Sequence, residues 1–338
     1  MSGDRGMPAD GALLAIDSLR VEFRSRDGTL PVIRELSMSV APGETVGVVG
    51  ESGCGKSMTA LSVMRLVPSP PGRIAGGRVR FEGRDLLSLS EREMRAIRGN
   101  RIAMIFQEPM TSLNPVFTIG NQIAEGIQLH EEVTDREALR RSIEALEAVG
   151  IPAPERRVHD YPHQLSGGMR QRVMIAMAIA CKPALLIADE PTTALDVTVQ
   201  AQIFDLLKDV QRRLGTAIIL ITHDMGAIAE MADKVVVMYA GRAVEAGPAR
   251  EVLKGPQHPY TTGLIRCVPH LLTDPGEERR ELEEIPGMVP SLRDIGVGCA
   301  FADRCPRVME RCHHELPPDF PVGEDHWAAC WLLAEERA

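Results

Sequence analysis

The fold is decided by residues 45–57, which read Thr-Val-Gly-Val-Val-Gly-Glu-Ser-Gly-Cys-Gly-Lys-Ser. Thr45–Val49 is a short β-branched run, and residues 56–67 have the composition of a helix. Between them, residues 50–57 fit the pattern G-x-x-x-x-G-K-[ST] in full, which chance produces in about 1% of chains of this length. A strand, a glycine loop and a helix in this order predict a phosphate-binding loop.

The predicted loop has a defined chemistry. Its glycines allow backbone N–H groups to turn inward around phosphates, and the following helix presents its positive end. Lys56 is expected to reach the β- and γ-phosphates, and the Ser57 hydroxyl to bind Mg²⁺. Cys54 is either a reactive thiol near a helix N-terminus or a small residue that fits the turn. The predicted nucleotide contacts are Gly50, Glu51, Ser52, Gly53, Cys54, Gly55, Lys56, Ser57 and Met58.

A second candidate site follows an apolar stretch. Residues 185–190 read Leu-Leu-Ile-Ala-Asp-Glu, which predicts a buried strand ending in two acids. Asp189 suits the Mg²⁺ shell, and Glu190 can polarise a water molecule for attack on the γ-phosphate. Acids often cap buried strands, so this pair alone is ambiguous. Downstream of a complete phosphate loop, the catalytic interpretation is favoured.

The rest of the chain alternates between predicted strands and helices, which indicates an α/β fold with a mainly parallel sheet. From about residue 255 the helical periodicity weakens, Pro and Gly become dense and cysteines appear, so we expect a domain boundary there. Further strands are predicted at residues 12–23, 38–40, 78–81, 101–105, 184–188, 217–221 and 235–239. Further helices are predicted at residues 121–129, 136–149, 169–180 and 200–214.

Composition narrows the class of protein. The chain has 338 residues, a net charge of −9 and an isoelectric point near 5.6, which argues against a nucleic-acid-binding protein. Residues 1–11 are small and polar, unlike a secretory signal, and are expected to be disordered. The longest apolar stretch, residues 173–188, is interrupted by Lys182 and Pro183 and is too short to span a membrane. We therefore expect a cytoplasmic chain whose membrane role comes through partners.

A third motif carries a family resemblance. Residues 165–172 read Leu-Ser-Gly-Gly-Met-Arg-Gln-Arg, which is either a second anion site at a helix start or an ordinary serine N-cap. A phosphate loop, this element and an Asp-Glu strand end, in that order, resemble the nucleotide-binding subunit of an ABC transporter. The resemblance runs from about residue 12 to the C-terminus. It implies a P-loop NTPase with a RecA-like core, an antiparallel β subdomain and a helical signature subdomain at about residues 108–178.

The resemblance also implies roles for single residues. Phe23 matches the aromatic residue that stacks on adenine, and His223 matches the histidine that contacts the γ-phosphate. Gln107 matches the glutamine that senses Mg²⁺ and the attacking water. In the family two subunits pair head to tail, so that one subunit closes over ATP bound to the other. The residues matching that contact are Ser166, Gly167, Gly168 and Asp196, the last within Ala194-Leu195-Asp196. Met169 departs from the family, where many relatives have glutamine.

Three further segments point to one branch of the family. Residues 106–115, 258–261 and 285–290 read Phe-Gln-Glu-Pro-Met-Thr-Ser-Leu-Asn-Pro, His-Pro-Tyr-Thr and Ile-Pro-Gly-Met-Val-Pro. They resemble the oligopeptide/dipeptide-permease ATPases. These importers use two paired ATPase subunits, and the segments resemble the first of them more than the second. The latter two segments form turns that could lay an extension over the domain. The expected domains are an ABC nucleotide-binding domain at residues 12–255 and a permease-type extension at residues 256–338.

The implied function is an ATPase that drives import of oligopeptides or dipeptides. Its implied partners are a homologous ATPase subunit in a heterodimer, two transmembrane permeases and an external substrate-binding protein, at the cytoplasmic face of the inner membrane. Relatives with similar ATPases handle nickel, glutathione or other small solutes, so these stay open as substrates. A soluble ABC ATPase acting on nucleic acid is disfavoured, because the chain has one cassette, no heptad arm and an acidic balance.

Four of the seven cysteines, Cys299, Cys305, Cys312 and Cys330, fall in the last 40 residues. Their spacing matches neither usual zinc pairs nor ferredoxin motifs. The resemblance implies a structural [4Fe-4S] cluster held by these four thiolates. Zinc, with or without His313, His314 or His326 in place of one thiolate, and plain buried cysteines are the alternatives. A cysteine tail that senses redox state and gates the ATPase is compatible with the function of an import motor.

Overall fold

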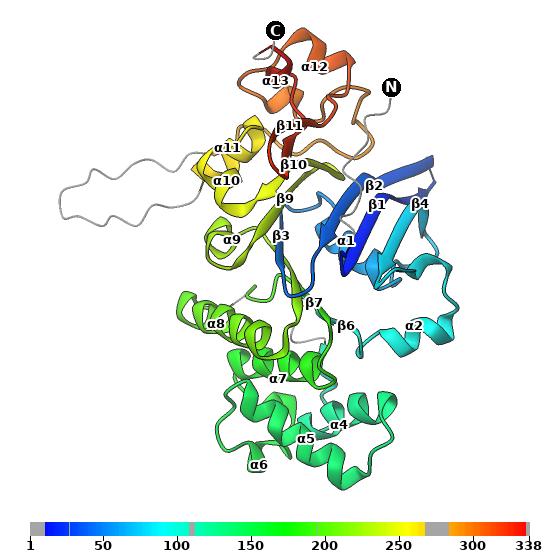
Figure 1. Ribbon diagram of the computed structural model, residues 1–338, viewed down its shortest axis with the longest axis vertical. Helices are drawn as coiled ribbons and strands as arrows, with labels where there is room; N and C mark the ends of the chain where they lie inside the picture. Colours follow the sequence, from blue (N-terminus) through cyan, green and yellow to red (C-terminus); the bar gives the residue numbers. More distant parts are fainter. Residues whose placement is uncertain (1–10, 27, 108–111, 194, 268–283, 336–338) are drawn as a thin grey trace, which may run out of the picture. The chain divides into compact units, whose positions relative to one another are not determined.

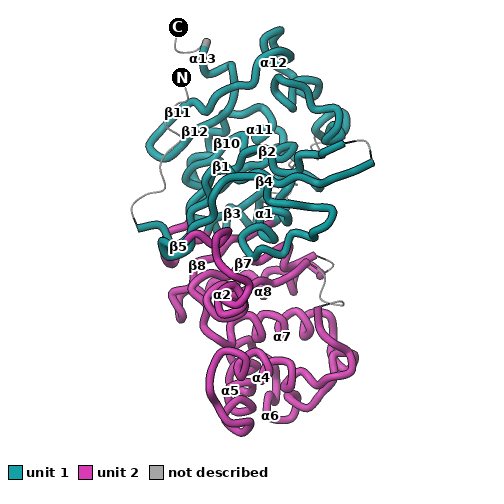
Figure 2. Tube along the Cα trace, turned by 90° about the vertical axis from the view of Figure 1, so that its right-hand side faces the viewer, with its two compact units in different colours: residues 1–39, 46–84, 222–338 teal, residues 40–45, 85–221 magenta. Residues whose placement is uncertain are grey.

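The computed structural model describes residues 11–26, 28–107, 112–193, 195–267 and 284–335. The predicted disorder of the N-terminus, Ala194 and residues 108–111 of the branch motif lie outside these ranges. The chain forms two compact units, coloured separately in Figure 2. The first unit comprises residues 1–39, 46–84 and 222–338, and the second comprises residues 40–45 and 85–221.

Strands in the first unit lie in the order β4-β1-β2-β10-β9-β3 (Figure 1). The β1–β4 pair is antiparallel, with Leu14 opposite Phe81, whereas β3 and β9 run parallel. The β3 segment is buried at every residue, as expected for a β-branched run in the interior of a sheet. These strands are β1 (Leu14–Ser25), β2 (Gly28–Val40), β3 (Thr45–Val49), β4 (Gly72–Phe81), β9 (Lys234–Tyr239) and β10 (Arg242–Pro248).

The C-terminal residues join this same unit. Two short strands, β11 (Phe320–Gly323) and β12 (His326–Ala328), pair with each other, and β12 adds antiparallel to β10. The backbone N–H of Ala329 also donates to the Val244 carbonyl at 2.8 Å. The helices here are α1 (Lys56–Val63), α9 (Met225–Met231), α10 (Ala249–Lys254), α11 (Pro259–Arg266), α12 (Glu310–His314), α13 (Leu332–Glu335) and the 3₁₀ turn η3 (Ala302–Arg304).

The second unit is built on three parallel strands in the order β8-β7-β6. Its strands are β6 (Ile102–Ile105), β7 (Leu185–Asp189) and β8 (Ala217–Thr222), and its longer segment, residues 85–221, begins within β5 (Arg84–Asp85). Its helices are α2 (Glu91–Ile97), α4 (Ile119–His130), α5 (Asp135–Ala148), α6 (Pro154–Arg157), α7 (Gly167–Ile179) and α8 (Val197–Leu214), with 3₁₀ turns η1 (Leu86–Ser88) and η2 (Pro162–Gln164).

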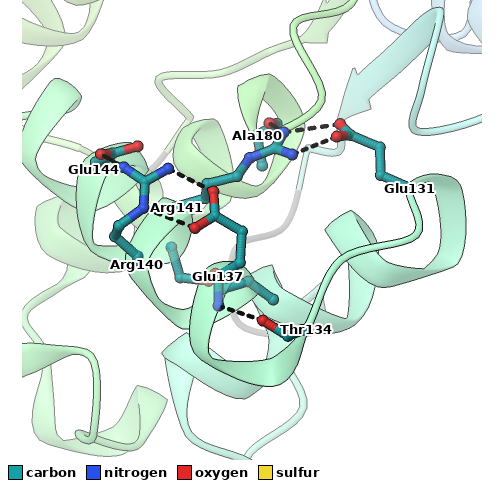
Figure 3. A network of polar contacts seen from close by, with 9 residues as sticks. Glu131, Thr134, Glu137, Arg140, Arg141, Glu144 and Ala180 are labelled. Carbon is teal, nitrogen blue, oxygen red and sulfur yellow. Dashed lines mark hydrogen bonds and ion pairs between the residues drawn. The ribbon is translucent and has the colours of Figure 1, made fainter.

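Side-chain hydrogen bonds and a left-handed glycine mark the ends of these helices. Thr134 accepts the Glu137 N–H at the start of α5, and Gly215 ends α8 in the left-handed conformation. Figure 3 shows the polar network along α5, in which Arg140 pairs with Glu137 and Glu144. Arg141, one position on, reaches Glu131 and the Ala180 carbonyl at the end of α7. Because most of these charges are exposed, the network orients α5 more than it stabilises the unit.

The predicted α/β class is confirmed, but the predicted mainly parallel sheet is wrong, because the pairing is mixed. The β3–β9, β6–β7 and β7–β8 pairs are parallel, whereas the β1–β4, β9–β10 and β10–β12 pairs are antiparallel. The first helix is shorter than expected, because α1 ends at Val63 and Arg65 takes a left-handed backbone conformation with φ 51°. Residues 256–267 and 284–335 belong to the same compact unit as the phosphate loop, and the domain boundary at residue 255 stays a prediction. Within the described ranges, no helix combines the length and the apolar character needed to cross a membrane.

Candidate functional site

The predicted phosphate loop leaves the carboxyl end of β3 and opens α1, as the sequence pattern requires. Gly50 has φ 150°, and a Cβ at this position would lie 2.2 Å from the Met238 carbonyl oxygen. Gly55 has φ 105° and forms the N-cap of α1. Both positions therefore exclude a side chain, for steric reasons at Gly50 and for backbone reasons at Gly55.

The Lys56 ammonium is held within this loop. Nζ donates to the Gly50 carbonyl at 2.7 Å and to the Glu51 carbonyl at 3.2 Å, and the side chain is 5% exposed. Ser52 and Gly53 at the tip are exposed. The loop thus presents open backbone at its tip and one buried cation at its base, which suits a polyphosphate.

Cys54 behaves as a packing residue. Its side chain is buried, and burial raises the pKa of its thiol above the ordinary value despite the nearby Lys56. A thiol with a raised pKa is mostly protonated at neutral pH and is a poor nucleophile. The structure therefore favours the small residue that fits the turn over the reactive thiol.

The acidic strand end lies in the second unit. Asp189 is the last residue of β7 and is 4% exposed. Glu190 follows with φ 48°, a left-handed conformation that is uncommon for glutamate, and its N–H donates to the Ile221 carbonyl at 2.9 Å. Gln107 Nε2 and Thr193 Oγ1 each donate to Glu190 Oε2 at 2.9 Å. This carboxylate is therefore oriented by its backbone and by two donors.

The contact between Gln107 and Glu190 brings two predicted site residues together across 83 positions of sequence. Thr193 was not predicted, although its position three residues after Glu190 places it at turn spacing. A left-handed glutamate at a strand end is a strained arrangement of the kind that clusters at active sites.

The signature element opens α7. The Ser166 hydroxyl accepts the Met169 N–H at 3.3 Å, so the N-cap interpretation is confirmed at the level of local structure. A Cβ at Gly168 would lie 3.0 Å from Val199 Cγ1 of α8, so glycine permits close approach of the two helices. Asp196, also a predicted contact, caps α8 by accepting the Val199 N–H at 3.0 Å. Ser166, Gly167 and Asp196 are exposed, as a surface that meets a partner requires.

Two other predicted residues lie in the first unit. Phe23 lies on β1 opposite Gly72 of β4, and a Cβ at Gly72 would approach its ring to 2.8 Å. The ring is partly exposed, so one part of it packs on the sheet and another faces outward. His223 is exposed directly after β8. The roles of Phe23 at adenine and of His223 at the γ-phosphate stay predictions.

The four cysteines of the extension line one small cavity, together with His258, Phe301 and Trp331. Burial raises the pKa of Cys299 and of Cys330 to about 11, so these thiols are protonated at neutral pH. Cys312 packs in an apolar cluster with Ala302 and Trp331. Nowhere in the described ranges do three or more His, Cys, Asp or Glu side chains form a group that could hold a metal ion. The expected iron–sulfur cluster is therefore not supported by the thiols as they stand, of which Cys312 and Cys330 are buried and Cys299 and Cys305 partly exposed.

The histidines proposed as substitute zinc ligands have other partners. His326 Nε2 lies 2.9 Å from Glu245 Oε1 in a buried pair. His314 lies 2.9 Å from Glu310, and His313 lies near Asp303. These contacts count against the zinc alternative with a histidine ligand. All seven cysteines of the chain are free.

A separate pocket of about 460 Å³ lies in the second unit between α5, the end of α7 and α8. Its lining includes the buried residues Ala145, Ile179 and Val210 and the exposed residues Arg140 and Lys182. None of the residues predicted to bind ATP or Mg²⁺ lines it.

Comparison with known proteins shows what this arrangement is similar to. Residues 33–193 match the ABC transporter family, and residues 244–312 match the C-terminal region of oligopeptide/dipeptide transporters. The chain is 52% identical to a probable peptide ABC transporter ATP-binding protein of Sinorhizobium fredii, over 97% of each chain. It is 50% identical to the oligopeptide transport ATP-binding protein OppD of Bacillus subtilis, over 95% of this chain and 89% of that one.

The fold agrees with these matches. A dimeric structure of MJ0796, a bacterial ABC transporter cassette, superposes with a TM-score of 0.63 at 25% identity, covering 70% of this chain and 99% of that chain. A structure of cbiO1 from Clostridium perfringens, part of an ABC transporter complex, gives a TM-score of 0.62 at 27% identity and covers 73% and 92% of the two chains. The phosphate loop, the Glu190 arrangement and the full-length identity lead to one conclusion: this chain belongs to the ABC transporter family, among the ATP-binding proteins of the oligopeptide/dipeptide type.

Proposed function

We propose that this chain is the ATP-hydrolysing subunit of an ABC importer for oligopeptides or dipeptides. The observation that carries the proposal is identity of about one half with peptide transport ATP-binding proteins over nearly the whole chain, the C-terminal extension included. The local geometry of the phosphate loop and of Glu190 supports ATP hydrolysis as the reaction.

In this proposal the loop from Gly50 to Met58 binds the phosphates of ATP. The Lys56 ammonium, held at the base of the loop, neutralises the β- and γ-phosphates. The residues suited to Mg²⁺ are the Ser57 hydroxyl, the Gln107 amide and the Asp189 carboxylate, since Mg²⁺ prefers oxygen ligands and keeps several waters. When bound, the ion supplies charge neutralisation on the phosphate oxygens. Phe23 stacks on the adenine ring.

Glu190 acts as the general base. Its Oε2 accepts hydrogen bonds from Gln107 and Thr193, and these hold the carboxylate in one orientation. In this proposal, a carboxylate held in this way activates the attacking water molecule. The carboxylate takes a proton from that water while the water oxygen attacks the γ-phosphorus. The bond between the γ-phosphorus and the leaving ADP oxygen breaks in the same step. His223 contacts the γ-phosphate.

The second ATP-facing surface acts in a dimer. Ser166, Gly167, Gly168 and Asp196 are proposed to close over ATP bound to a second, homologous ATPase subunit. Because each complete site then needs two chains, the isolated monomer is expected to hydrolyse ATP slowly. Closure and reopening of this heterodimer would drive two membrane permeases between their two facing states, since ATP favours the closed form. Peptides would arrive through an external binding protein, and this chain would act at the cytoplasmic face of the inner membrane.

The cysteine cavity is proposed to hold a structural metal group in the cell. Four thiols around one cavity are the donor set of a [4Fe-4S] cluster, and zinc is the alternative. The thiols would have to lose their protons and draw closer together, because their raised pKa values describe metal-free groups. Anaerobic purification followed by iron, sulfide and zinc analysis tests this. A colourless protein free of iron and zinc refutes it.

Function is tested in the assembled importer. This chain is co-expressed with the proposed permeases and second ATPase subunit, and the complex is purified in detergent and reconstituted with the proposed binding protein. Short peptides are expected to raise the ATPase rate several-fold, whereas nickel and glutathione leave it unchanged. Stimulation by nickel or glutathione alone would refute the peptide assignment. Failure of the assembled complex to hydrolyse ATP would refute the proposed reaction.

A further inference from the structure

One residue of the phosphate loop, Glu51, is held by the C-terminal extension. Its backbone N–H donates to the Tyr260 hydroxyl at 2.8 Å. Its carboxylate accepts two hydrogen bonds from Arg304, from Nη1 at 2.7 Å and from Nη2 at 3.0 Å. Its carbonyl accepts from the Lys56 ammonium at 3.2 Å. Every polar group of Glu51 is thus engaged, and two of the three are engaged by residues more than 200 positions away.

All five N–H groups of the Arg304 guanidinium have an acceptor. Besides the two bonds to Glu51, Nη1 donates to the Tyr239 hydroxyl at 3.2 Å and Nη2 to the Ile285 carbonyl at 3.3 Å. Nε donates to the Pro286 carbonyl at 2.9 Å. These are five acceptors for the five N–H donors of a guanidinium, which is all that the group can use. The side chain is only 5% exposed, and its bonds to Glu51 raise its pKa further.

This ion pair adds little net stability, because the buried Arg304 guanidinium loses its hydration while the Glu51 carboxylate stays partly exposed. What a bidentate pair does supply is fixed geometry. The two branch segments at residues 258–261 and 285–290 provide its surroundings: Tyr260 comes from the first, and the carbonyls of Ile285 and Pro286 come from the second. Folding of the extension therefore places two side chains, Tyr260 and Arg304, against one residue of the phosphate loop, and the Ile285 and Pro286 carbonyls hold Arg304 there.

The position of Glu51 also affects the position of the Lys56 ammonium. Its ammonium is positioned by the carbonyls of Gly50 and Glu51, so a shift of Glu51 displaces the cation that meets the phosphates. Arg304 also neutralises the Glu51 carboxylate, which unpaired would place a negative charge on the loop that receives ATP.

We propose that Arg304 and Tyr260 are positioning residues for the nucleotide, through which the C-terminal extension holds the phosphate loop in its ATP-receiving shape. The inference rests on the proposed binding of ATP by this loop. It deepens that function by making ATP affinity depend on a segment outside the nucleotide-binding motifs. The extension then acts as a built-in effector of the site, and Cys305, beside Arg304, connects the loop to the cysteine cavity.

The test measures binding of Mg–ATP to the full-length chain by calorimetry. Arg304→Gln is expected to weaken binding about tenfold, because it frees Glu51 and leaves its charge unpaired. Tyr260→Phe removes only the hydroxyl that accepts the Glu51 N–H, and about threefold weakening is expected. The matched control is Arg311→Gln, which removes an arginine of the same extension that pairs with Glu315 and stacks on the Trp331 ring instead of contacting Glu51. Its affinity is expected to equal that of the wild type.

Two further readouts separate positioning from mere stability. In the assembled transporter, Arg304→Gln is expected to raise KM for ATP about tenfold and to leave kcat within about twofold, since bound ATP restores the loop. Adding Glu51→Gln to Arg304→Gln is expected to cause no further loss, because both changes break one contact.

Unchanged affinity in both Arg304→Gln and Tyr260→Phe would overturn the inference, as would multiplicative losses in the double variant. If Arg304→Gln does not fold, Tyr260→Phe decides the question alone. Failure of the wild-type chain to bind Mg–ATP would instead refute the proposed function.

Discussion

His258 makes the stability of the extension depend on pH. The side chain is 1% exposed, its Nδ1 accepts the Tyr260 N–H at 3.0 Å, and its backbone N–H donates to Glu245 at 2.9 Å. Burial lowers the pKa of His258 from 6.5 to about 3. In the unfolded chain the imidazole gains a proton below about pH 6.5, whereas in the folded chain it stays neutral until about pH 3. The unfolded state therefore binds more protons in this window, and stability falls as pH falls.

Each pH unit in this window is expected to cost about 1.4 kcal/mol, so about 2 kcal/mol is lost between pH 6.5 and about pH 5. His258→Asn keeps a side-chain acceptor for the Tyr260 N–H and removes the titrating group. The two tryptophans of the chain, Trp327 and Trp331, both lie in the extension, so their fluorescence during urea unfolding follows this region. The wild type is expected to lose about 2 kcal/mol more than His258→Asn over that range. Equal pH slopes in the two proteins would refute the argument.

Two other predictions concern the nucleotide site. Glu190→Gln is expected to bind ATP normally and to slow phosphate release about 10²-fold or more, because an amide cannot accept the proton of the attacking water. The control is Glu155→Gln, a change at an exposed residue of α6. An unchanged rate of phosphate release in Glu190→Gln would rule out Glu190 as the general base. Gly50→Ala is expected to abolish ATP binding and to destabilise the chain by about 2 kcal/mol, because its Cβ meets the Met238 carbonyl at 2.2 Å. Gly53→Ala, with no atom within 4 Å of its Cβ, is expected to fold with a smaller loss, and equal thermal stability of these two variants would contradict the steric argument.

Local signals in the sequence were enough for the phosphate loop and the central strands. The loop needs glycines where the backbone takes positive φ, and a buried parallel strand needs β-branched residues, so both leave a pattern within a few positions. The end of α1 was misplaced because Leu66 and Val67 continue an apolar pattern, while the chain has already turned at Arg65.

The contacts around Glu51 could not be predicted in the same way. Arg304 lies 253 positions from Glu51, and nothing in the residues around Arg304 distinguishes it from the other arginines of the extension. For residues 258–261 the sequence predicts a family branch and a turn, but not a contact with the phosphate loop. In the structure, His258 of this segment caps α11, and the Tyr260 hydroxyl contacts the phosphate loop.

The cysteine spacing was the weakest of the sequence signals. The resemblance predicted a cluster of four ligands, and the structure brings the four side chains to one cavity without a metal-ready arrangement among the described residues. Sequence separation reports neither side-chain direction nor the bond lengths that a metal site requires.

The most direct test of the central claim compares the wild-type chain with Lys56→Ala, each assembled with the second ATPase and the permeases. Retained Mg–ATP and released phosphate are measured on the same samples. The wild type is expected to retain ATP and to release phosphate, and Lys56→Ala to do neither, because the cation at the base of the loop is gone. Equal retention and equal release in the two complexes, or neither in the wild type, would contradict the account.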